Sequence, residues 1–281
     1  MNASRSLAAG LRRHDRDRYQ TALFAPADRR RALFTLYAFN HEVARIREAV
    51  REPMLGLIRL QWWRDALAEI YDGARPRRHE IVEPLAAAIR AHGLSQAHFT
   101  ALLDARARDM DESPPESLAA LEAYAAGVSG RLALLALEIL GIDDPVAGVA
   151  GSAVGTAYAL SGLLAAAAFH ARQRRVYLPQ DLIARHRLNL DRSLLALKPS
   201  PELAAVAREI AQRALAHLDE ARRRRGAIPR AALPVLLHGV VVERRQRRLA
   251  ALDHNVMNPD FAREDTLQIM RLALAAWRGR F

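Results

Sequence analysis

The sequence predicts an all-α fold, and three features of the 281-residue chain support this prediction. Ala, Leu and Arg, which favour helices, dominate the composition, whereas runs of β-branched residues are short. Asn-Gly and Asp-Gly hairpin signals do not recur at regular spacing. Pro and Asp at helix starts and Gly at helix ends divide the chain into segments of helical length.

The helix boundaries follow from these punctuating residues. A proline suits a first helical turn, where its missing N–H group is not needed, and Pro26, Pro53 and Pro145 each precede a helical pattern. A glycine suits the residue after a helix because it adopts the left-handed conformation at little cost. Glycine ends are expected at Gly73, Gly93, Gly141 and Gly226. The expected helices, roughly eight to ten in number, include residues 29–51, 54–71, 84–92, 95–110, 117–140, 145–171, 201–225, 235–252 and 263–278.

No linker rich in Gly or Ser and no repeat of fixed period interrupts this series. We therefore expect one domain over residues 1–281, in which residues 1–14 form a flexible extension. The segment Met1–Arg13 has no apolar run of the kind found in secretory signals, which favours a cytoplasmic protein.

The charge balance favours anionic partners. The formal net charge is +11, and Lys198 is the sole lysine among 42 basic residues, the others being arginines. A positive surface attracts nucleic acid, acidic lipid or diphosphates. The absence of cysteine excludes disulfides and thiolate metal sites.

A stretch of 36 residues, from Pro145 to Gln180, contains neither Asp nor Glu. Its uncharged part, residues 145–171, is long enough to cross a bilayer. Its Ala, Gly, Ser, Thr and Val residues are only weakly hydrophobic, however, and it contains His170. Small residues on all faces suit a helix packed inside a bundle, so we expect a buried central helix.

Residues 34–48 read Phe-Thr-Leu-Tyr-Ala-Phe-Asn-His-Glu-Val-Ala-Arg-Ile-Arg-Glu, with Tyr37 in the stem. This segment resembles the first motif of the squalene/phytoene synthase family, in which a similar stem leads into an Asp-Asp-x-x-Asp cluster that binds Mg²⁺. The resemblance places the leading aspartates on Ala44 and Arg45, the last acid on Glu48 and an upstream arginine on His41. On a continuous helix the two local acids, Glu42 and Glu48, would lie about 240° apart and could not face one cavity.

The second motif lies at the end of the acid-free stretch, which closes with Arg175-Val176-Tyr177-Leu178-Pro179. This strip resembles the Arg-x-Tyr-Leu-Pro sequence that follows the second aspartate-rich motif of the same family. Counting back places the family's Asn on Gly162, its Arg-Asp pair on Ala165 and Ala166, and its final Asp on His170. The next carboxylate, Asp181, follows Pro179. Since hard cations need several oxygen ligands, the sequence predicts that no Mg²⁺ site remains.

Further strips support the resemblance. The segment from Tyr124 to Gly130 resembles the family's Tyr-x-x-x-Val-Ala-Gly sequence, whose small residues let helices approach the substrate tunnel. The match is strongest to a divergent branch of the family, the assembly factors of respiratory complex I and their bacterial relatives. The strips shared with that branch are Ala38–Glu42, Gly56–Trp63, Leu137–Ile142 and Ala276–Phe281.

The resemblance implies the isoprenoid-synthase fold, a helical bundle around a central cavity lined by Tyr37, His41, Ala44, Arg45, Glu48, Gly130, Gly162, Ala165, Ala166, His170, Arg175 and Tyr177. It implies a catalytically degenerate homologue without a cofactor, which binds a protein partner in complex I assembly. The cavity could hold a lipid or an isoprenoid-like ligand. The alternative is an active head-to-head prenyl diphosphate transferase that requires Mg²⁺ and uses His41, Glu48 and His170.

For several residues a purely structural role stays open beside the functional one. His41 and His170 are either an acid/base pair or satisfied core histidines. Arg45, Arg172, Arg174 and Arg175 either bind an anion directly or lie at solvated helix ends. Two arginine runs, Arg222–Arg225 and Arg244–Arg248, either form a solvated face or contact an acidic protein or membrane, the latter at the inner membrane. No nucleic-acid-binding motif accompanies them, so specific nucleic-acid binding is not expected.

Overall fold

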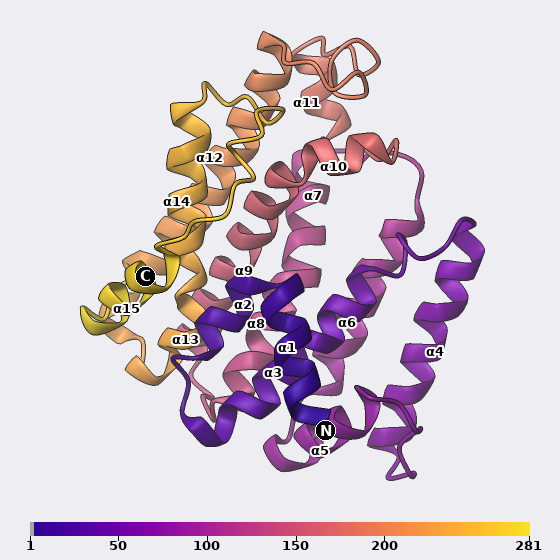
Figure 1. Cartoon of the computed structure of the whole chain (residues 1–281), viewed down its shortest axis with the longest axis vertical. Coiled ribbons are helices and arrows are strands. Elements are labelled where there is room, and N and C mark those ends of the chain that lie inside the picture. The colour runs from indigo at the N-terminus through magenta and orange to yellow at the C-terminus, as the bar shows by residue number, and fades with distance from the viewer. Residues whose placement is uncertain (1–2) are drawn as a thin grey trace.

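The computed structural model describes residues 3–281, which form a bundle of helices joined by short turns (Figure 1). No strand occurs in this range, so the all-α prediction is confirmed. Residues 1 and 2, part of the expected flexible extension, lie outside the described residues, and residues 3–14 form helix α1, which buries Leu7 and Leu11.

The longer helices match most of the expected segments. Their bounds are α3 Ala27–Ala44, α4 Pro53–Tyr71, α5 Val82–His92, α6 Gln96–Ala107, α7 Leu118–Ala125, α8 Arg131–Ile139, α9 Pro145–Ala165, α12 Pro201–Arg223, α14 His238–Ala251 and α15 Gln268–Trp277. The shorter helices are α1 Ala3–His14, α2 Arg16–Ala22, α10 Ala167–Arg172, α11 Gln180–Arg185 and α13 Leu233–Leu236.

Helix α9 runs through the middle of the bundle and packs against α12, α14, α8 and α7 (Figure 1). Its sequence explains this position, because Ala, Gly, Ser and Thr allow neighbouring helices to approach from every side. Asp144 begins the helix by accepting a hydrogen bond from the main-chain nitrogen of Ala147 at 2.7 Å. By length and composition α9 and the segment Leu118–Ile139 could each cross a membrane, but half or more of each is buried inside the bundle. That burial is what core helices of a bundle show.

A close helix approach involves a π-helical turn, Ala126–Gly130, between α7 and α8. Gly155 of α9 lies against this turn, and a Cβ atom on Gly155 would come within 2.4 Å of the Ser129 carbonyl oxygen. A Cβ on Gly130 would in turn meet the Ser152 hydroxyl at 2.9 Å. The two glycines therefore allow backbone-to-backbone packing in the centre of the bundle.

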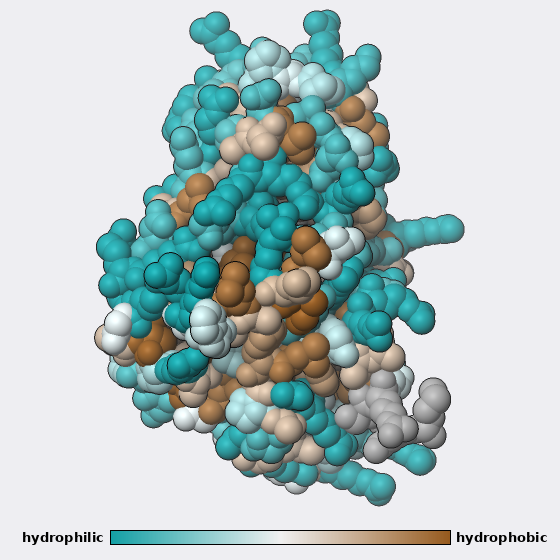
Figure 2. All heavy atoms as spheres, turned by 60° about the vertical axis from the view of Figure 1, so that its left-hand side comes forward, coloured by the Kyte–Doolittle hydropathy of each residue, from teal (hydrophilic) through white to brown (hydrophobic). Residues whose placement is uncertain are grey.

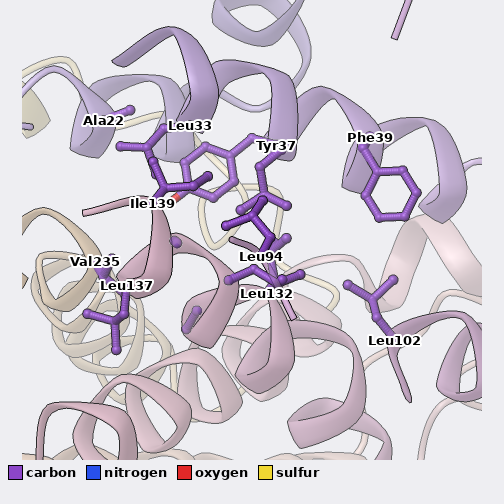
Figure 3. Packing of buried hydrophobic residues seen from close by; sticks show 14 of the residues in the cluster. Ala22, Leu33, Tyr37, Phe39, Leu94, Leu102, Leu132, Leu137, Ile139 and Val235 are labelled. Carbon is purple, nitrogen blue, oxygen red and sulfur yellow. The ribbon is translucent and has the colours of Figure 1, made fainter. Parts of the chain in front are cut away.

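Two hydrophobic cores lie along α9. The first contains Leu33, Phe39, Leu102 and Leu132 and surrounds α3, α6 and α8 (Figure 3). The second contains Leu164, Leu182 and Ile210 and joins the far end of α9 to α11 and α12. Helices α9, α12 and α14 contribute side chains to both cores.

Several predicted boundaries were wrong. The helix expected over residues 29–51 ends at Ala44, where Arg45 adopts ψ −4° and the chain continues in turns to residue 49. The helix expected over residues 145–171 breaks at Ala166, and the one expected from residue 263 begins only at Gln268. Gly73, Gly93 and Gly141 have the predicted positive φ, whereas Gly226 does not.

Candidate functional site

A polar network is buried where α2, α3, α9 and α14 meet. At its centre Arg18 of α2 forms an ion pair with Asp15 at 2.7 Å. The guanidinium lies 4.9 Å from the ring centre of Tyr158 and 5.8 Å from that of Tyr37. The Arg18 guanidinium thus lies between the two tyrosine rings, and Asp15 neutralises its charge.

Asp17 is the second anchor of this central network. Its carboxylate accepts hydrogen bonds from the Tyr158 hydroxyl at 3.0 Å and from Gln268 at 2.7 Å, and it forms an ion pair with Arg245 of α14. Burial raises the pKa of Asp17, but the Arg245 charge and the two hydrogen bonds outweigh it and hold the pKa below its ordinary value. Asp17 is therefore a charged, fully engaged carboxylate.

His238 closes the network beneath Tyr37 and Tyr158. Its Nδ1 atom lies 2.9 Å from the Val235 carbonyl oxygen, and its Nε2 atom lies 3.3 Å from the Thr21 hydroxyl. Burial, together with the nearby Arg18 charge, lowers the pKa of His238 to about 4. The neutral imidazole therefore fits this interior at physiological pH.

A hollow of about 430 Å³ opens beside the central network. Gly162, Ala165 and Ala166 of α9 form one wall, so three of the predicted second-motif positions do face a common space. Arginines of α14 and the segment 261–268 form the opposite wall.

The four carboxylates that line this hollow are each paired with an arginine. The pairs are Asp15–Arg18, Asp17–Arg245, Glu264–Arg16 and Asp265–Arg244. Within residues 3–281, no group of three or more His, Asp or Glu side chains is arranged to hold a metal ion. A Mg²⁺ ion would have to displace guanidinium groups from these carboxylates, so the residues do not fit the metal site of a prenyl diphosphate synthase.

A second polar cluster surrounds Asp109, whose side chain is only 4% exposed. It accepts hydrogen bonds from the hydroxyls of Tyr124 at 2.6 Å and Tyr177 at 2.9 Å and pairs with Arg106 at 3.2 Å. The guanidinium of Arg175 donates to the Asp109 carbonyl oxygen at 3.1 Å. The predicted pair Arg175 and Tyr177 therefore holds the loop after α10 onto the short 3-10 turn Arg108–Met110 that follows α6.

His170 belongs to this second cluster. Its ring lies 4.7 Å from that of Tyr177, and its Nδ1 atom is buried without a hydrogen-bond partner. Burial and the Arg175 charge lower the pKa of His170 to about 4. The next acid along the chain, Asp181, accepts a hydrogen bond from the Leu118 main-chain nitrogen at 3.1 Å and so begins α7 rather than facing a cavity.

A hollow of about 830 Å³ borders this cluster, because Tyr124, Arg175 and Tyr177 line it. Arg174 and Arg175 line it, together with Arg47 and Arg108, and Asp111, Glu112 and Glu116 face them. The hollow therefore contains charges of both signs, and its electrostatics do not favour an anionic ligand over a cationic one.

The predicted first-motif positions lie elsewhere. His41 stacks on His14 at 5.3 Å, and its Nε2 atom is buried without a partner. Arg45 lines a separate hollow of about 440 Å³ with Trp62 and Trp63 and lies 3.9 Å from the solvent-accessible Glu48. Ala44 ends α3. The hollows described here thus divide the predicted site residues, and none of them contains His41, Glu48 and His170 together.

The sequence interpretation missed the residues that build the central network. Asp15, Asp17 and Arg18 precede the first motif, and Tyr158 is the single tyrosine of the uncharged helix α9. A lone tyrosine in such a helix was an available signal, because a buried hydroxyl requires a hydrogen-bond partner. Arg245 had been assigned to a basic surface.

Most of that arginine surface is neutralised. Five of the eight arginines in the runs 222–225 and 244–248 form ion pairs, namely Arg222, Arg224, Arg244, Arg245 and Arg247. These residues tie α12 and α14 to neighbouring acids, so they mainly stabilise the bundle.

Comparison with known proteins gives a consistent picture. A family model described as "Squalene/phytoene synthase" matches residues 11–278. The chain is 32% identical over 271 residues to the Bos taurus assembly factor 6 of NADH dehydrogenase (ubiquinone) complex I, covering 96% of this chain and 81% of that protein. It is 28% identical over 209 residues to presqualene diphosphate synthase of Rhodopseudomonas palustris, covering 72% of each chain. A crystal structure of a dehydrosqualene synthase superposes with a TM-score of 0.85 at 16% identity over 98% of this chain and 95% of that one, which supports the predicted fold.

Proposed function

Because the chain belongs to the squalene/phytoene synthase family, we propose that it is a non-catalytic member that assists the assembly of respiratory complex I. The similarity to assembly factors spans nearly the whole chain and supports this role. The family fold alone does not carry a function, so the chemistry of the site has to decide between assembly and synthesis.

One observation carries the proposal: the four carboxylates beside the family's second-motif positions are all paired with arginines. In a prenyl transfer the C–O bond breaks and diphosphate leaves the prenyl group. Divalent ions neutralise the charge of the departing diphosphate, and those ions require free carboxylate oxygens. At Gly162, Ala165 and Ala166 the chain has no side-chain carboxylate to offer. A folded bundle with this interior can bind a partner, but it lacks the means to activate a diphosphate.

In this role the protein needs no cofactor and acts in the cytoplasm, at the inner face of the membrane where complex I is assembled. A lipid or isoprenoid-like ligand would occupy one of the larger hollows, because the spaces beside His170 and beside Tyr37 have volumes of only about 10 Å³ each.

The second candidate function is an active head-to-head prenyl diphosphate transferase, which the similarity to presqualene diphosphate synthase favours. It would depend on Mg²⁺ and on His41, Glu48 and His170. Their positions argue against it, because Glu48 is solvent-accessible while His41 and His170 are enclosed in different surroundings.

Genetic rescue tests the assembly role. Deletion of the gene in its native host should lower the amount of assembled complex I on a native gel, and plasmid-borne wild-type protein should restore it. The triple variant His41→Ala, Glu48→Ala, His170→Ala should restore assembly as well, since none of these side chains is needed for chemistry. Normal complex I in the deletion strain would contradict the proposal.

A turnover assay tests the alternative. Purified protein would be incubated with farnesyl or geranylgeranyl diphosphate and Mg²⁺, and diphosphate release would be followed. We expect no release above a protein-free control. Release that Glu48→Ala abolishes would establish the transferase instead.

A further inference from the structure

Helix α15 presents several large apolar side chains to solvent. Trp277 is 75% exposed and Met270 66%, and Leu274 is also exposed. These residues are spaced i, i+4 and i+7, so they share one face of the helix. Figure 2 turns this side of the molecule forward and shows brown side chains among the teal ones. An amphipathic helix on a bundle normally turns such a face inward, so the arrangement calls for a partner.

The folded bundle does not use this face. The opposite side of α15 holds the helix in place through the fully buried Leu272 and through Gln268, which donates to Asp17 of the central network. Arg230 donates to the carbonyl oxygens of Ala276 and Trp277 at 3.4 and 3.3 Å. The exposed face can therefore be changed without disturbing the packing.

Positive charge surrounds the C-terminal end of α15. Arg278 and Arg280 directly follow α15, and neither forms an ion pair or a side-chain hydrogen bond within residues 3–281. Arg222 and Arg225 donate to the main-chain oxygen of Phe281, which brings the end of α12 to the same place. Helix α15 itself contains no Asp or Glu, and the preceding Glu264 and Asp265 are paired with arginines.

We propose that α15 docks the protein on an anionic lipid bilayer, with Met270, Leu274 and Trp277 inserted at the headgroup level and the arginines on the lipid phosphates. Tryptophan favours the membrane–water interface because its ring is apolar and its N–H is polar. An arginine can place its methylene groups against the apolar region and keep its guanidinium at the phosphates. A short helix with an apolar face and a basic edge is the type that binds anionic membranes from one side. This inference deepens the proposed function, since it states how an assembly factor would reach a membrane complex.

A second exposed apolar face supplies the matched control. At the start of α4, Met54 is 63% and Ile58 is 58% exposed. Figure 1 shows α4 and α15 on opposite sides of the bundle. Charges of both signs flank the α4 face, namely Arg51, Glu52 and Arg59, so its electrostatic preference for an anionic surface is weaker.

The experiment is vesicle co-sedimentation of the purified full chain. Vesicles of phosphatidylcholine would be compared with vesicles that also contain phosphatidylglycerol, at low and high salt. We expect binding to the anionic vesicles only, weakened by salt. Met270→Ser with Trp277→Ser should lower the affinity at least about tenfold, since large apolar side chains dominate insertion. Arg278→Gln with Arg280→Gln should lower it by about fivefold per charge.

Met54→Ser with Ile58→Ser should leave vesicle binding unchanged, and equal melting temperatures would show that all variants are folded. Brominated lipids should quench the fluorescence of the wild type, and Trp277→Phe, which keeps the apolar character, should remove that quenching. Absence of binding to anionic vesicles would overturn the inference, as would binding that the α15 variants do not reduce. A dimer in solution that Met270→Ser with Trp277→Ser dissociates would assign the face to a second copy instead. Because these measurements use purified protein, they fail or succeed independently of the rescue of complex I.

Discussion

Asp17 is the residue on which the central network depends, because one carboxylate joins α2, α9, α14 and α15. It holds Arg245, Tyr158 and Gln268 at once, and the side chains of Asp17 and Arg245 are only 15% and 26% exposed. Removing one partner of such an ion pair leaves the other charge poorly solvated, which costs more than the loss of a neutral hydrogen bond.

We therefore predict that Asp17→Asn lowers the free energy of unfolding by about 2–4 kcal/mol, somewhat less than for a fully buried pair because Arg245 keeps some contact with water. Tyr158→Phe, which removes one hydrogen bond and leaves the ion pair, should cost about 1 kcal/mol. Urea unfolding followed by circular dichroism would measure both values. Equal losses in the two variants would mean that the ion pair contributes nothing beyond a hydrogen bond.

His238 makes stability depend on pH. Its pKa of about 4 lies below the value of about 6.5 for an unfolded histidine, so between these values the unfolded chain binds more protons than the folded one. The contribution of the neutral imidazole is complete above pH 6.5 and is lost as the pH falls toward 4. By pH 5 the loss should reach about 2 kcal/mol.

His238→Gln, which cannot titrate at this position, should show a smaller fall in its urea midpoint between pH 7 and pH 5 than the wild type. His170 has a comparable low pKa and remains in both proteins, so only the difference between their pH slopes reports on His238. Identical slopes would indicate that His238 is already protonated, or solvated, in the folded protein.

At the residue scale, the sequence located the positions where the family's carboxylates are missing. It did not locate the residues that form the central network. Gly162, Ala165 and Ala166 follow a countable spacing from Tyr177, and they do face one hollow. The partnership of Asp17 with Arg245 joins positions that are 228 residues apart, and no local pattern encodes it. Tertiary packing also decided that Glu48 would lie in a turn, because the helix expected to carry it ends at Ala44.

Between elements, the contact of α9 with the π-helical turn depends on a missing side chain. A methyl group on Gly155 would lie 2.4 Å from the Ser129 carbonyl oxygen and 3.0 Å from the Gly130 Cα atom, so backbone would have to move. Gly162 lies two turns further along the same helix and has nothing within 4 Å of its Cβ position. Alanine substitutions at Gly155 and Gly162 therefore compare a position where packing is tight with one where only helix propensity should matter.

Gly155→Ala should lower the free energy of unfolding by about 1–3 kcal/mol through overpacking. Gly162→Ala should leave it unchanged or raise it by up to about 1 kcal/mol, because alanine restricts the unfolded chain and favours the helix. Thermal unfolding of both variants would decide. A stabilised Gly155→Ala protein would show that the two segments do not approach as closely as described.

Composition predicted the type and order of the elements but not all their limits. Pro and Gly fixed the start of α4 and the ends of α5 and α8, where local backbone chemistry is decisive. The break at Ala166 between α9 and α10 carries no proline or glycine and arises from how the chain turns over the second core. Short helices such as α11 lie below the length at which periodicity can be recognised.

For the whole molecule, the remaining question is whether the two hydrophobic cores behave as one domain. All three tryptophans lie outside the second core: Trp62 and Trp63 pack in or against the first, and Trp277 is on α15. Fluorescence therefore reports on the first core and its surroundings, whereas circular dichroism reports on every helix.

Because α9, α12 and α14 extend through both cores, we predict a single unfolding transition that both signals share. Leu102→Ala in the first core and Leu182→Ala in the second remove fully buried side chains, and each should cost about 2–5 kcal/mol. The informative variant is Leu182→Ala, since it should move the fluorescence transition although no tryptophan is near it. Leu182→Ala could instead shift only part of the circular dichroism signal and leave the fluorescence midpoint unchanged. The second core would then unfold by itself, and α9 would link two domains rather than belong to one.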